Sequence, residues 1–158
     1  MIEFKNNVKG FRLYHRNQLI VWLQKVARKH QKTIGTLHYT FCSDAEILHL
    51  NQTFLNHNYY TDIITFDYSE GNTLSAEIFI SVETVASNAE LFHVKPKDEL
   101  HRVMVHGLLH LLGYKDKIKT EQKNMRILEN ECLEILQPLI SKSNLISKNV
   151  VSRETKTR

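Results

Sequence analysis

The sequence is poor in the residues that crosslink small extracellular proteins. Among its 158 residues only two are cysteines, Cys42 and Cys132, and they share no short spacing typical of a metal site. Two cysteines do not make a disulfide framework, so we expect reduced thiols and a cytoplasmic protein.

Long apolar segments are also missing. The first residues, MIEFKNNVKGF, lack the apolar run of a signal peptide. No other stretch approaches the roughly 20 apolar residues that cross a bilayer, so we expect no membrane partner. The composition, 42% hydrophobic and 24% charged, is that of an ordinary globular domain, and the length suits one domain with a substantial core.

Positive charge is absent from the middle of the chain. Residues 33–94 contain eight acidic residues and no Lys or Arg, whereas residues 1–32 and 95–126 each hold eight basic residues. The residues after Ile140 carry five basic residues and one acid, which accounts for the whole net charge of +4. Net charge therefore gives no general argument for nucleic-acid binding, but the basic segment 95–126 gives a local one.

The hydrophobic pattern predicts four strands and five helices in mixed order, which favours a single α/β (α+β) domain over residues 1–140 with a small mixed sheet. Ser43 and Glu46 have the spacing of a capping box, while Gly113 and Pro138 are expected to end the last two helices. Residues 141–158 lack periodicity and are expected to form a basic, disordered tail that either binds RNA by charge or is dispensable. The expected strands are 2–4, 36–42, 62–66 and 77–82, and the expected helices are 14–29, 43–54, 83–92, 97–112 and 120–136.

The informative segment is VMVHGLLHLLGYKDK, residues 103–117. His106 and His110 are four residues apart, which places both imidazoles on one helical face. Gly113 ends the helix, so that Asp116 can turn back toward the same ion. Two histidines and one carboxylate leave coordination positions open, as a catalytic zinc site requires. A chance pair is the alternative, but burying two unpaired imidazoles on this apolar helix would cost about 1–3 kcal/mol each, which a metal ion would remove.

The segment resembles the metalloprotease motif H-E-x-x-H-x-x-G-x-x-H/D with one important difference. Position 107 is glycine, where those proteases carry a glutamate general base. A metallopeptidase-like hydrolase is therefore the weaker alternative. A metal ion here is better suited to activating water or neutralising a phosphate.

Three segments resemble the YbeY family of endoribonucleases. HGLLHLLGYKD at 106–116 matches the family signature H-G-x-L-H-L-x-G-Y-D-H except at its last two positions. YTDIITF at 60–66 resembles P-T-D-V-L-S-F, and AEIFIS at 76–81 resembles G-D-I-x-I-S. Met125 and Glu129 fit a downstream M-x-x-x-E, so the resemblance covers roughly residues 35–136.

The resemblance implies an α/β fold with one Zn²⁺ in an open cleft. It also implies single-strand-specific endoribonuclease activity, maturation of the 3′ end of 16S ribosomal RNA and ribosome quality control, with ribosomal RNA and the small ribosomal subunit as partners. The implied metal ligands are His106, His110 and, in place of the family's third histidine, Asp116. Two further departures are Leu55, where the family has an arginine proposed to meet RNA, and Ala76-Glu77 in place of Gly-Asp.

Other site residues remain open at the level of sequence. Arg102, Lys115 and Lys117 are candidate RNA contacts, although each lysine alone is more typical of a solvated surface. Asp62 either supports catalysis near the metal or shapes the turn before a strand, and no general base is assigned. A ribosome-assembly factor with a purely structural metal is the alternative to an enzyme.

Overall fold

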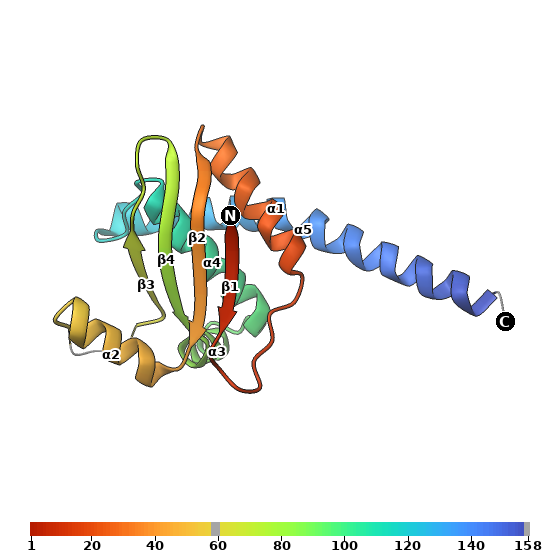
Figure 1. The fold of residues 1–158 in the computed structure, drawn as a ribbon, viewed down its shortest axis with the longest axis horizontal. Coiled ribbons are helices and arrows are strands. Elements are labelled where there is room, and N and C mark those ends of the chain that lie inside the picture. The colour runs from red at the N-terminus through yellow and green to blue at the C-terminus, as the bar shows by residue number, and fades with distance from the viewer. Residues whose placement is uncertain (58–60, 157–158) are drawn as a thin grey trace.

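The computed structural model describes the backbone of residues 1–57 and 61–156, and side chains as far as residue 144. Within these described residues, nine elements follow one another along the chain (Figure 1). They are β1 (Ile2–Asn6), α1 (Arg16–Lys29), β2 (Thr33–Cys42), α2 (Asp44–Phe54), β3 (Ile63–Asp67), β4 (Thr73–Ser81), α3 (Val82–Leu91), α4 (Pro96–Leu111) and α5 (Lys119–Lys156).

The strands form one mixed sheet in the order β1-β2-β4-β3. β1, β2 and β4 are parallel, and β3 runs antiparallel to β4. Parallel neighbours need a crossover connection, which α1 supplies between β1 and β2. β3 and β4 are joined instead by a tight turn, where Gly71 adopts a φ of +57° that favours glycine.

The main core lies between the sheet and the helices α1, α4 and α5. Leu37, Tyr39 and Phe41 alternate along β2 and are fully buried, as a half-covered strand requires. The Tyr39 hydroxyl donates a hydrogen bond of 2.8 Å to the carbonyl of Met104, which ties β2 to α4. A smaller cluster around Ile47 and Ile64 lies where α2 packs on the sheet.

Helix α4 approaches the sheet closely and is buried over most of its length. A Cβ at Gly107 would lie 2.9 Å from Cδ1 of Ile63 and 3.3 Å from Cδ1 of Ile78, so glycine permits this approach. The helix ends as predicted at Gly113, whose φ is +101°. The N–H of Tyr114 then donates to the carbonyl of Leu109 at 3.1 Å.

The predicted fold class is confirmed, and the described residues form the expected four strands and five helices, with ends shifted by up to about four residues except at the end of α5. The cap at Ser43 is also confirmed, because its hydroxyl accepts a hydrogen bond from the N–H of Glu46 at 3.2 Å. No helix within the described residues has both the length and the apolar character to cross a membrane.

One prediction about the last helix is wrong. α5 does not end at Pro138 but continues to Lys156, so residues 141–156 are helical where a disordered tail was expected. Tertiary contacts explain the continuation, because Ile140 beyond the proline is buried in the main core. Gln18 of α1 also donates a hydrogen bond of 3.0 Å to the hydroxyl of Ser143. The end of α5 extends beyond the body of the molecule (Figure 1).

Candidate metal centre

His106, His110 and Asp116 converge on one point, as their spacing predicts. One potential ligand atom from each lies within 4.8 Å of the others. The Nε2 atoms of the two histidines are 2.9 Å apart. Oδ2 of Asp116 lies 3.2 Å from Nε2 of His106 and 3.4 Å from Nε2 of His110. Helix α4 supplies both imidazoles, and the loop after Gly113 supplies the carboxylate.

Hydrogen bonds on the far side of each ring fix which nitrogen faces this point. Nδ1 of His106 lies 2.7 Å from Oε2 of Glu129, and Nδ1 of His110 lies 2.9 Å from the carbonyl oxygen of Tyr114. An ionised carboxylate and a carbonyl can only accept, so both Nδ1 atoms donate. In the neutral rings, both Nε2 atoms therefore carry lone pairs.

This arrangement fits a metal ion. Two imidazole lone pairs and a carboxylate oxygen repel one another at 2.9–3.4 Å unless a cation lies among them. Ligands about 2.0–2.1 Å from a tetrahedral zinc ion are about 3.3 Å apart, close to these separations. The donor set also leaves coordination positions open.

Glu129 is the functional residue to which sequence reasoning assigned no role. Its side chain is 6% exposed, and its second oxygen accepts a hydrogen bond of 3.0 Å from Nη1 of Arg102. Arg102 also donates from Nη2 to the side chain of Asn130 at 2.8 Å. The sequence feature that could have identified Glu129 is an acidic residue within an otherwise apolar helical stripe. The buried members of this stripe in α5 include Met125, Cys132, Leu136 and Ile140.

Two acids near the centre, the partly buried Asp62 and the buried Glu99, have perturbed pKa values. Burial raises the pKa of Asp62, which His106 opposes and Glu129 reinforces. Burial likewise raises the pKa of Glu99, with Arg102 and Arg126 opposing. Burial alone would lower the pKa of His106, but the hydrogen bond and charge of Glu129, together with Asp116, raise it. The acids Asp62, Asp116 and Glu129 gather around His106, an arrangement that suits a cation.

The other predicted site residues lie around the centre and are not among the three convergent side chains. Arg102 faces Glu129 and Asn130, while Lys115 and Lys117 are exposed on the loop that carries Asp116. Asp62 precedes β3 and interacts electrostatically with His106. Leu55 caps the end of α2 and is 41% exposed.

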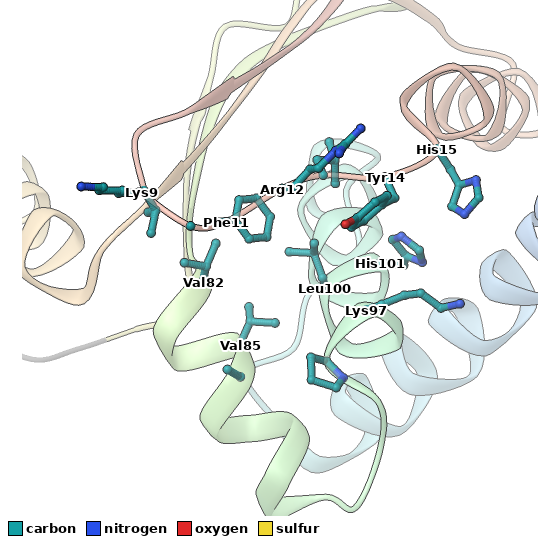
Figure 2. Close-up of a pocket in the computed structure, with 15 residues that line it drawn as sticks. Lys9, Phe11, Arg12, Tyr14, His15, Val82, Val85, Lys97, Leu100 and His101 are labelled. Carbon is teal, nitrogen blue, oxygen red and sulfur yellow. The ribbon is translucent and has the colours of Figure 1, made fainter.

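Two hollows in the surface differ in their relation to this centre. A cavity of about 180 Å³ adjoins it, lined by His106, Asp116, Gln122, Met125, Arg126 and Glu129. A larger cavity of about 450 Å³ lies between residues 8–15, α3 and α4, where Phe11, Val82, Val85 and Leu100 face a common space (Figure 2). None of the three convergent ligand residues lines this larger cavity.

The fold and the site define an α/β protein whose central helix and following loop present two histidines and a carboxylate that could hold a metal ion. The model of the family Endoribonuclease YbeY matches residues 2–137. This chain belongs to that family.

Individual relatives agree with this assignment. The chain is 50% identical over 115 residues to Endoribonuclease YbeY of Parabacteroides distasonis, covering 73% of this chain and 81% of that protein. It is 47% identical over 133 residues to Endoribonuclease YbeY of Cytophaga hutchinsonii, covering 84% and 92% of the two chains. The fold is similar to the solution structure of TM1509 from Thermotoga maritima, with a TM-score of 0.64, 28% identity and coverage of 91% and 93%.

Proposed function

We propose that this protein is a zinc-dependent, single-strand-specific endoribonuclease. The observation that carries the proposal is the convergence of Nε2 of His106, Nε2 of His110 and Oδ2 of Asp116, each able to offer a lone pair to one cation. Family membership supplies the RNA substrate class, because the relatives are named as endoribonucleases.

The three convergent residues would hold the ion, and two neighbours would position them. When bound, a divalent cation at such a site supplies Lewis-acid chemistry for phosphodiester hydrolysis, polarising a phosphate oxygen or lowering the pKa of water. Glu129 fixes the orientation and tautomer of His106, and Arg102 holds Glu129 in turn. The carbonyl of Tyr114 does the same for His110.

Asp62 is our candidate for a supporting role in proton transfer. Its carboxyl group is close enough to His106 for the two charges to interact, and burial raises its pKa, the direction that favours a carboxyl able to carry a proton. We further propose that Lys115 and Lys117, exposed beside Asp116, contact the RNA backbone.

The biological substrate we propose is the 3′ end of 16S ribosomal RNA in the cytoplasm, with the small ribosomal subunit as partner and a part in ribosome quality control. Support comes from the family resemblance of the sequence and from the family match.

The test replaces one proposed metal ligand at a time and measures both bound zinc and RNA cleavage. His110→Ala and Asp116→Ala should lose stoichiometric zinc in elemental analysis, and His110→Ala should lose cleavage of a single-stranded RNA. His49→Ala, on the exposed side of α2, is the matched control and should retain both. Cleavage by rigorously purified His110→Ala at the rate of the wild type would refute the proposal. Zinc retained by Asp116→Ala would exclude Asp116 as the third ligand.

A structural metal in a non-catalytic assembly factor is the second candidate. The observation that favours it is that the centre joins α4, the loop after Gly113 and, through Glu129, α5. This alternative expects ligand variants to lose stability and ribosome association while purified wild type cleaves no RNA.

The structure argues against a metallopeptidase-like hydrolase. Those enzymes carry a glutamate general base where this chain has Gly107, which packs against the sheet, and a Cβ there would lie 2.9 Å from Cδ1 of Ile63 and 3.3 Å from Cδ1 of Ile78, so a glutamate would require these side chains to shift.

A further inference from the structure

We infer that Arg126 and Gln122 of α5 form a binding site for an RNA phosphate beside the metal ligands. The identity of the ligand rests on the proposed function, because a phosphodiester is what an endoribonuclease brings to its metal. The site itself rests on the position and charge of two side chains to which nothing in the sequence pattern gave a role.

The first step is placement. Gln122, Arg126 and Glu129 are four and three residues apart, so they lie on one face of α5. All three line the cavity of about 180 Å³ that also contains His106 and Asp116. The hydrogen bond of 2.7 Å from His106 to Glu129 fixes this face of the helix against the ligands.

The second step is charge. Besides His106, the charged residues that line the cavity are Asp116, Glu129 and Arg126. A phosphate entering it would meet two carboxylates, so a cation other than the metal would favour its binding. Arg102 is close by, but its guanidinium is already bonded to Glu129 and Asn130. Arg126 provides the only permanently positive side chain among the residues lining this cavity.

The third step is availability. Arg126 is exposed and forms no ion pair with any residue whose side chain the structure describes. Its charge acts on buried Glu99 from a distance, lowering the pKa of that carboxyl against the effect of burial. A guanidinium can donate two parallel hydrogen bonds to a phosphate, and the Gln122 amide one further N–H. The cavity therefore has donors for a phosphate as well as ligands for a metal.

The test measures RNA binding without catalysis. Metal-free protein is titrated with a short, fluorescent, single-stranded RNA, and anisotropy is followed over a series of salt concentrations. Arg126→Ala should bind about five- to tenfold more weakly than wild type. The slope of log affinity against log salt should fall by about 0.7, the value for one phosphate contact with a single strand. Arg126→Lys should retain the slope of the wild type, and Gln122→Ala should weaken binding without changing it.

Arg28→Ala is the matched control, because it removes an exposed guanidinium from α1, away from the cavity. Circular dichroism and thermal melts of every variant check that the fold is retained. If Arg126→Ala and Arg28→Ala bind RNA with equal affinity and slope while wild type cleaves RNA, the phosphate site is wrong and the proposed function stands. Wild type that neither binds nor cleaves single-stranded RNA overturns both.

Discussion

Single residues around the centre form a chain of hydrogen bonds that begins at the surface with Asn130 and ends at His106, a proposed metal ligand. Asn130 and Glu129 accept hydrogen bonds from Arg102, and Glu129 accepts one from His106. A buried carboxylate is costly unless it is paired, and here both of its oxygens have a charged or polar donor. The pairing holds the imidazole of His106 in the one tautomer that presents Nε2 to a metal.

The substitution Glu129→Gln tests whether the hydrogen bond and charge of Glu129 support His106 as a metal ligand. The amide can still accept from His106, but the negative charge that strengthens the imidazole as a ligand is gone. We expect zinc affinity to fall about 10- to 100-fold, the usual effect of losing such a partner. Competition with a chromophoric chelator measures the affinity directly.

Glu131→Gln removes an exposed carboxylate two residues further along α5 and should leave zinc affinity unchanged. Equal affinities for the Glu129→Gln and Glu131→Gln proteins would show that Glu129 is only a structural partner of Arg102.

At the scale of elements, the features that bring the candidate ligands of α4 together can be recognised in its sequence. The four-residue spacing of its histidines and the glycine that ends it were sufficient to predict which side chains converge. Glu129 and Arg126 could not be assigned in the same way, because their roles depend on how α5 is oriented against α4. That orientation is set by packing between distant segments, to which local periodicity gives no guide.

For helix α5 the sequence prediction failed for a different reason. The local rule that proline ends a helix was overridden by tertiary packing. Proline lacks the N–H that would bond to the carbonyl four residues earlier, and its ring crowds that carbonyl. The penalty of about 3 kcal/mol usually ends a helix, but burial of Leu136 and Ile140 on either side of Pro138 stabilises the continuous form.

Pro138→Ala should therefore stabilise the protein, by about 1–3 kcal/mol in the free energy of unfolding, because it restores the missing hydrogen bond. Urea denaturation followed by far-ultraviolet circular dichroism measures the change. Pro96→Ala is the matched control, since a proline at the first position of α4 breaks no helical hydrogen bond. A Pro138→Ala protein no more stable than wild type would mean that α5 does not continue through this position in solution.

For the whole molecule, the mixed fold was predictable from the order of strand and helix patterns. The arrangement of the strands was not, because the antiparallel pairing of β3 with β4 inside a parallel sheet depends on long-range contacts. The burial of one histidine also depends on packing between distant segments. His101 lies five residues before His106, a spacing that places it on a different helical face from the two convergent histidines, but its burial could not be read from the sequence: it is 4% exposed, and its ring centroid lies 6.2 Å from that of Trp22.

His101 should make the stability of the molecule depend on pH. Burial lowers its pKa to about 4, with Lys97 and His15 acting in the same direction and Asp98 opposing. In the unfolded chain the pKa is about 6.5, so between these two values the unfolded state binds more protons than the folded state. Stability from this group is complete above pH 6.5 and is lost as the pH falls toward 4, by about 3 kcal/mol in all.

Urea denaturation between pH 7.5 and 4.5 measures this loss, with chelator present throughout so that release of a metal ion does not contribute. His101→Phe keeps an aromatic ring beside Trp22 but cannot be protonated, and it serves as the comparison. Carboxylates and exposed histidines titrate in both proteins, so the difference between the two stability curves isolates His101. That difference should grow steadily as the pH falls below 6.5, because the folded protein resists placing a charge in its core. Parallel curves for the two proteins would mean that His101 becomes protonated without cost, and hence that its ring reaches solvent.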